Sequence, residues 1–218
     1  MTDFSHLPRI LLASRSPRRS ELLAREGLDF DVEVPLVEEK DEEDADPRLM
    51  VLHNARLKGD EVAAHHPDRL VISSDTTVAI DGTVLAKPAD MADARRMLCL
   101  LAGRTHTVYT AVLVQMRSEG FRIERCEESR VTFKPLSEAD ITRYFGIVNP
   151  LDKAGAYGIQ EGREIIIDHF EGSLSNIMGL PMEALREMLE QAGEACTQRV
   201  QRPSPPVAAP RKACPETI

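Results

Sequence analysis

Three arginines surround the expected start of a helix near the beginning of the chain: Arg15, Arg18 and Arg19. The apolar run Ile10–Ala13 predicts a buried strand, and Ser16 followed by Pro17 is typical of a helix start. Because a helix N-terminus carries partial positive charge, cations in the first turn are unfavourable unless an anion joins them. A strand, a serine-rich turn and a helix N-terminus together favour a phosphate site. The alternative, that the arginines extend into solvent, stays open on this stretch alone.

Further along the chain, Asp75 is expected to end a buried strand that begins with Leu70–Ile72. The carboxyl ends of strands border the ligand crevice in α/β folds. Basic side chains also fall at expected turns or element ends: Lys58, Lys87 and Lys153. Singular polar residues lie in late loops: Gln160, Ser173, Ser175 and Asn176. Together these residues indicate polyphosphate binding with a carboxylate that activates water or holds a cation, although Asp75 could instead only cap a turn.

The composition narrows the function further. The 218 residues include 27 basic and 36 acidic residues, and a net charge of −9 argues against a nucleic-acid binder. Aromatic residues make up 4% of the chain, which argues against a platform for base stacking. Four widely spaced cysteines predict neither a structural zinc site nor a disulfide framework. The sequence lacks the G-x-x-x-x-G-K-[ST] motif, so a P-loop enzyme is not expected.

The chain has no signal peptide pattern and no apolar stretch of about 20 residues, which predicts a cytoplasmic protein without a membrane span. Residues 1–196 are expected to form one domain with its own core. From Thr197 to Ile218 the composition changes to five prolines, four basic residues and one acid. Such a segment has no apolar face to bury, so residues 197–218 are predicted to be a disordered tail.

Apolar periodicity predicts strands and helices that alternate along the chain. The expected strands are Ile10–Ala13, Asp29–Val34, Leu70–Ile72, Thr105–Gln115, Phe121–Phe133 and Ile165–Ile167. The expected helices are Pro17–Glu26, Met50–Ala64, Asp90–Leu101, Ser137–Phe145 and Met182–Gln191. The acidic run Glu38–Asp44 is typical of a solvated loop, although its first residues, Glu38 and Glu39, could reach a metal ion.

The dipeptide Asp81-Gly82 predicts a hairpin, and its register affects the site. A two-residue loop pairs Thr76 with Lys87, whereas a three-residue loop places Lys87 opposite Asp75. If Asp75 and Lys87 serve one site, we expect the bulged three-residue loop or a bend near Asp75.

Six motifs occur along the chain in the order in which one known family has them. They are Ala13–Arg19 with Leu22-Leu23, Ser74–Thr76, Ala86–Pro88, Gly103–His106, Asp152–Gln160 and Gly172–Pro181. By these motifs the sequence resembles the Maf-type nucleoside triphosphate pyrophosphatases from about Ile10 to Leu189. The resemblance implies a mixed α/β fold akin to the inosine triphosphate pyrophosphatases, with a long twisted sheet flanked by helices and a central cleft between two lobes.

The resemblance also implies a reaction and its residues. The family hydrolyses a nucleoside triphosphate between the α- and β-phosphates with a divalent cation, Mg²⁺ or Mn²⁺, and homodimers are expected. On this resemblance Asp75 is the general base, and Glu39, or Glu38 after a register slip, is an acidic residue near the metal, which Asp75 also helps to hold. The phosphate-binding residues are expected to be Ser14, Arg18, Arg19, Lys58 and Lys87.

Three positions resemble the branch of the family that acts on dTTP and UTP: Arg18, Thr76 and Gln160. A neutral amide at Gln160 can donate and accept hydrogen bonds, which matches the edge of a uracil or thymine ring. A carboxylate there would instead suit the positively charged base of 7-methyl-GTP, which is the alternative substrate class. A nucleotide-binding regulator of cell division without turnover is the alternative from another class of function.

Overall fold

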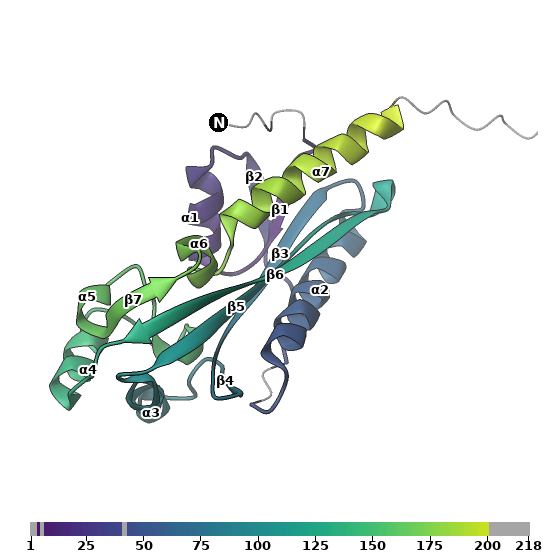
Figure 1. Cartoon of the computed structure of the whole chain (residues 1–218). Helices are drawn as coiled ribbons and strands as arrows, with labels where there is room; N and C mark the ends of the chain where they lie inside the picture. Colours follow the sequence, from purple (N-terminus) through teal and green to yellow (C-terminus); the bar gives the residue numbers. More distant parts are fainter. Residues whose placement is uncertain (1–3, 5–6, 41–42, 201–218) are drawn as a thin grey trace, which may run out of the picture.

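The computed structural model describes residue 4, residues 7–40 and residues 43–200. Within this part of the chain, seven strands form one mixed sheet in the order β2-β1-β3-β5-β6-β7, with β4 paired to β3 (Figure 1). The strands are β1 (Ile10–Ala13), β2 (Phe30–Glu33), β3 (Leu70–Ile80), β4 (Thr83–Leu85), β5 (Thr105–Met116), β6 (Phe121–Phe133) and β7 (Ile167–Glu171). Strands β2, β1 and β3 are parallel, and the remaining pairs are antiparallel. The predicted mixed α/β sheet is therefore confirmed.

Helices cover both faces of the sheet (Figure 1). They are α1 (Pro17–Arg25), α2 (Pro47–His65), α3 (Met91–Leu101), α4 (Glu138–Phe145), α5 (Arg163–Ile166), α6 (Leu174–Ile177) and α7 (Met182–Val200), with short 3₁₀ turns η1 (Arg117–Glu119) and η2 (Ala154–Ala156). Alternation along β1 separates the two sides of the core, because successive strand residues point to opposite faces. Leu11 packs with residues of α2, whereas Leu12 belongs to the larger cluster that includes residues of α1 and α7.

The sequence analysis expected strand β3 to end near Asp75, but the strand is longer. It continues to Ile80 because β5 pairs with it from Val71 to Ala79, so that Asp75 lies in the middle of the strand. Two serines within β3 have hydrogen-bond partners outside the sheet. Ser73 Oγ donates to the carbonyl of Ala55 at 2.7 Å, and Ser74 Oγ donates to the carbonyl of Gly179 at 3.0 Å.

The predicted hairpin between β3 and β4 is confirmed, and of the two registers considered it has the two-residue loop rather than the bulged three-residue one. Ile80 pairs with Thr83, and both Asp81 (φ 52°) and Gly82 (φ 79°) adopt the left-handed conformation. Two left-handed residues characterise a type I′ turn, which matches the twist of antiparallel strands. Lys87 reaches the same site as Asp75 because β4 ends at Leu85, before Lys87 could pair within the sheet.

Two other predicted elements differ in the structure. The apolar run Ile165–Ile167 was expected to be a strand, but it divides between helix α5 and strand β7, since a short apolar run does not distinguish the two by periodicity. Helix α7 extends beyond Gln191 to Val200, because Ala192 is buried and Cys196 packs against the core. Residues 197–200 thus belong to this helix, and residues 201–218 of the predicted tail lie outside the described residues.

A cluster of three rings lies inside the core beside β5. His106 contacts the rings of Phe133 and Tyr157 edge-on, and its Nε2 is hydrogen-bonded to the Tyr157 hydroxyl at 2.7 Å. Burial lowers the pKa of His106 to about 3, because the charged imidazolium is poorly solvated there. The unfolded chain therefore binds a proton at His106 between about pH 6.5 and pH 3 that the folded protein does not bind.

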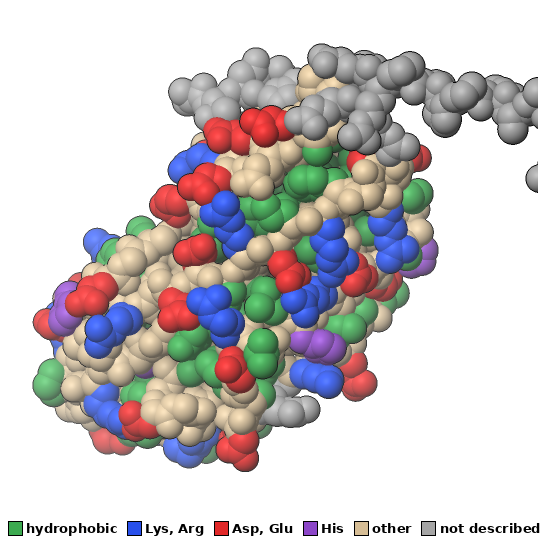
Figure 2. Space-filling model, turned by 45° about the vertical axis from the view of Figure 1, so that its right-hand side comes forward, with side chains coloured by type: hydrophobic (Ala, Val, Ile, Leu, Met, Phe, Trp, Pro, Cys, Tyr) green, Lys and Arg blue, Asp and Glu red, His purple; other side chains and the backbone are tan. Residues whose placement is uncertain are grey.

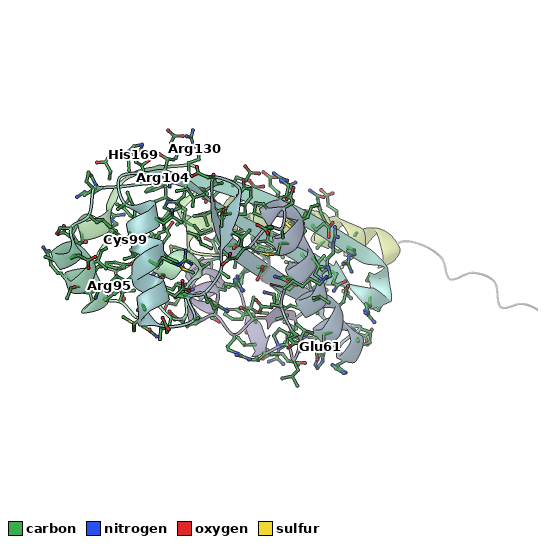
Figure 3. The ribbon with its side chains drawn as sticks, turned by 90° about the horizontal axis from the view of Figure 1, so that it is seen from below. Glu61, Arg95, Cys99, Arg104, Arg130 and His169 are labelled. Atoms are coloured by element: carbon green, nitrogen blue, oxygen red, sulfur yellow. The ribbon has the colours of Figure 1, made fainter. Side chains whose placement is uncertain are left out.

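We expect this histidine to reduce the stability of the protein in mild acid. Between pH 7 and pH 5, the wild-type free energy of unfolding should fall by about 2 kcal/mol more than that of His106→Asn. Chemical denaturation at both pH values measures the difference. The control is His169→Asn, because His169 is exposed on β7 near Arg130 (Figure 3). An equal pH dependence in the wild type and in His106→Asn would contradict the prediction.

Candidate active site

A cavity of about 710 Å³ gathers every site residue that the sequence analysis named as a ligand or catalyst. Its walls come from the β1–α1 loop, the segment after β2, the middle of β3, the chain after β4 and residues 151–160. The predicted residues that line it are Ser14, Arg18, Arg19, Glu39, Lys58, Asp75, Thr76, Lys87 and Gln160. The structure thus brings these residues together, while their individual roles stay predictions.

Arg19 connects three of the walls through one guanidinium group. Its Nε donates to the carbonyl of Gly179 at 2.8 Å, its Nη1 to Ser14 Oγ at 3.2 Å, and its Nη2 to Thr76 Oγ1 at 3.2 Å. Burial is the largest influence on Arg19 and lowers the pKa of this guanidinium, although Asp75 and Glu39 oppose the shift. Since an arginine has five N–H donors, part of the fork is still available to an anion in the cavity.

The start of helix α1 differs in one detail from the prediction. Ser16 is the N-cap residue, but its side chain makes no capping hydrogen bond. Ser14 Oγ instead accepts the backbone N–H of Ser16 at 3.1 Å and also contacts Arg19. Ser14 is buried, so its hydroxyl shapes the turn that presents Arg15 and Arg18 at the cavity wall.

The segment before η2 carries a carboxylate to which the sequence analysis gave no role of its own. Asp152 lies 4.0 Å from Nη1 of Arg18 and 2.5 Å from Nζ of Lys153. It therefore balances two of the cavity's cations, one from helix α1 and one from the loop before η2.

Two side chains of helix α2 donate hydrogen bonds to the carboxylate of Asp75. Its Oδ1 accepts a hydrogen bond from Lys58 Nζ at 2.6 Å, and its Oδ2 accepts one from Asn54 Nδ2 at 3.2 Å. The side chains of Lys58 and Asp75 are only 4% and 8% exposed. The sequence analysis did not single out Asn54, because one asparagine within a helical pattern carries no signal of its own. Only the packing of α2 against β3 shows its role.

Glu39 is the second carboxylate close to Lys58. Its Oε1 is 3.6 Å from Lys58 Nζ, whereas Glu38, the alternative in register, lines the cavity without a described ion pair. Burial raises the pKa of Glu39, but the positive charges of Lys58, Lys87 and Arg19 outweigh it and hold the pKa below its usual value. Glu39 is therefore ionised at neutral pH.

The polar residues of the late loops divide into two groups. Gln160 is exposed at the cavity, whose lining also includes the apolar side chains of Tyr157, Ile159 and Met178. Ser173 and Ser175 do not line the cavity, and both donate to Glu183 at the start of α7. Asn176 is fully buried and donates to Val108 O and Ser129 Oγ. These three residues organise the loop that supplies Gly179 to Arg19.

Comparisons with known proteins show the family of the chain. The Maf-like protein family matches residues 9–192. The chain belongs to this family. It is 44% identical over 187 residues to a dTTP/UTP pyrophosphatase of Deinococcus radiodurans, covering 85% of this chain and 94% of the relative. A dTTP/UTP pyrophosphatase of Akkermansia muciniphila is 42% identical over 187 residues, covering 86% and 98%. Among solved structures, the Staphylococcus aureus Ham1 protein matches with 16% identity and a TM-score of 0.49, covering 84% of this chain and 98% of that chain.

The carboxylates of this Maf-like protein suit a cation that binds together with a phosphate. Among the described residues, no group of three or more His, Cys, Asp or Glu is placed to hold a metal ion. Both Glu39, in the segment after β2, and Asp75, in β3, however, lie within 4 Å of Lys58 Nζ. Mg²⁺ is commonly bound by one or two carboxylates, water and substrate phosphates. This donor set therefore fits such an ion.

Many charged side chains outside the cavity form ion pairs within the described part of the chain. On the face shown in Figure 2, basic and acidic side chains are interspersed over the surface. Ion pairs such as Arg125–Glu187, at 2.6 Å, connect β6 with α7.

In the part of the chain that the structure describes, no helix combines the length and the apolar character needed to span a membrane.

We expect Arg19→Lys to weaken polyphosphate binding about tenfold, as measured with inorganic tripolyphosphate by calorimetry. Lysine keeps the charge but lacks the planar fork that bonds Ser14, Thr76 and Gly179. Loss of one charge-assisted hydrogen bond corresponds to roughly this factor. Arg25→Lys is the matched control, since Arg25 is exposed at the end of the same helix. Equal affinities of the two variants would contradict a binding role for Arg19.

Proposed function

We propose that this Maf-like protein hydrolyses nucleoside triphosphates between the α- and β-phosphates, releasing the monophosphate and pyrophosphate. The observation that carries the proposal is that one cavity places Asp75 among Lys58, Arg19 and Lys87. The relatives that this chain matches over nearly their full length are named dTTP/UTP pyrophosphatases, which supports the proposal. The cavity is also large enough for a nucleotide, since sites for ligands of this size commonly measure about 300–1,000 Å³.

The charges of the cavity suggest a role for each wall. We assign the binding of the triphosphate to Arg18, Arg19 and Lys87, which line the cavity from two segments, the start of α1 and the chain after β4. Binding from both segments fixes the reacting phosphorus relative to Asp75 and so lowers the entropic part of the barrier. Asp75 keeps free lone pairs although it accepts two hydrogen bonds, and it directs the attacking water as a general base.

A divalent cation, Mg²⁺ or Mn²⁺, is part of the proposal. Glu39 and Asp75 would hold it together with phosphate oxygens of the substrate. Such an ion supplies electrostatic stabilisation of the charge that develops on the phosphate oxygens. Lys58 contacts both carboxylates, and its positive charge offsets the repulsion between them.

We propose dTTP and UTP as the preferred substrates. Gln160 is exposed at the cavity, and its amide can both donate to and accept from the edge of a uracil or thymine ring. Apolar contacts from Ile159 and Met178 would cover the face of the base. A cationic base such as that of 7-methyl-GTP has no carboxylate to meet at position 160.

We expect Asp75→Asn to lower kcat by about 10²–10⁴, the usual effect of losing a positioned general base. Pyrophosphate release measures the rate. Because the substitution removes the charged partner of Lys58, circular dichroism is needed to check that the variant is folded. Asp68→Asn is the control, since Asp68 is exposed and does not line the cavity. Full activity of Asp75→Asn would eliminate the proposed role of Asp75.

A panel of nucleoside triphosphates tests the substrate and the cation together. With Mg²⁺ or Mn²⁺, we expect dTTP and UTP to have the highest kcat/KM, and a chelator to abolish pyrophosphate release. A preference for 7-methyl-GTP would overturn the choice of substrate. Thermal stabilisation by nucleotides without any pyrophosphate release would instead show a nucleotide-binding regulator rather than an enzyme.

A further inference from the structure

The segment that carries Glu39 has little local structure to hold it in place. Residues 34–40 form neither helix nor strand, and Leu36 is 85% exposed. Among the described residues, the backbone of residues 36–40 makes hydrogen bonds only with the side chain of Asn54. The position of Glu39 therefore depends on contacts made by side chains rather than on a strand or helix of its own.

Asn54 makes two of these contacts with one residue. Its Oδ1 accepts the backbone N–H of Lys40 at 2.9 Å, and its Nδ2 donates to the Lys40 carbonyl at 2.8 Å. The second N–H of the same amide donates to Asp75 Oδ2 at 3.2 Å. Because Asn54 is fully buried, these bonds have little competition from water. The amide thus joins the Glu39 segment to the carboxylate of β3.

The position of Asn54 on helix α2 explains how it reaches both partners. Asn54 and Lys58 are four residues apart, so they lie on the same face of the helix. Lys58 binds one oxygen of Asp75 and Asn54 binds the other, which fixes the plane of the carboxylate. Helix α2 begins at an Asp46 cap and runs for 19 residues, and it is a rigid support for both side chains.

We propose that Asn54 is a positioning residue that holds the Glu39 segment against Asp75. Through it, the two carboxylates that would hold the cation are kept at a fixed separation, and Asp75 is oriented toward the reacting phosphate. The catalytic half of this inference rests on the proposed function, whereas the anchoring of the segment does not. Ser14, Arg19 and Lys87 have no described contact with Asn54, so nucleotide binding depends much less on it.

The test uses Asn54→Leu, which has a similar shape but cannot make the three hydrogen bonds. We expect kcat to fall about 10- to 100-fold, as for other losses of positioning, while KM changes less than about threefold. Hydrogen–deuterium exchange without nucleotide should show faster uptake in peptides that cover residues 36–40. The control is Val51→Ala, because Val51 is equally buried on α2 but packs with Ala55 and Ala111 outside the cavity. It should lower stability without changing kcat or the exchange of residues 36–40.

Three results would overturn the inference. They are a kcat of Asn54→Leu within twofold of the wild type, unchanged exchange of residues 36–40, and an equal loss of kcat in Val51→Ala, which would mean that stability alone sets the rate. If the unchanged protein hydrolyses no nucleotide, the proposed function and the catalytic half of the inference both fail. The exchange measurement then decides the anchoring by itself.

Discussion

A buried pair of opposite charges, Lys58 and Asp75, is the interaction on which the rest of the site depends. Removing two ions from water costs several kcal/mol each, and this cost is offset only by a short contact with the remaining polar atoms bonded. The 2.6 Å separation and the amide of Asn54 meet this condition. Helix α2 and strand β3 must therefore dock accurately, because either charge alone would be buried without a partner.

The close approach of α2 to the sheet has a local cause. A Cβ atom at Gly59 would lie 2.6 Å from Ser73 Oγ and 2.7 Å from Leu113 Cδ2, both closer than real contacts allow. The missing side chain lets the helix approach β3 and β5 at the level of Lys58, one residue earlier. Glycine weakens a helix interior by about 1 kcal/mol, a cost that packing offsets here. The same approach lets Ser73 donate to the Ala55 carbonyl.

Three of the cations that line the cavity have an acidic neighbour within 4 Å. Lys58 contacts both Asp75 and Glu39, and Asp152 contacts both Arg18 and Lys153. Such an arrangement keeps several positive charges near one another without the repulsion they would have alone.

The sequence by itself determined the helices and strands with strong periodicity, the turn between β1 and α1 and the cavity residues that the family motifs share. Those signals are local, and they lie within a few consecutive residues. Only the tertiary structure decided the length of β3 through its pairing with β5, the two-residue hairpin and the division of Ile165–Ile167 between α5 and β7. It also decided the part played by Asn54, whose partners lie 14 and 21 residues away. An amide in a helical pattern gives no local sign of such partners, because long-range packing and buried hydrogen bonds exist only once the elements meet.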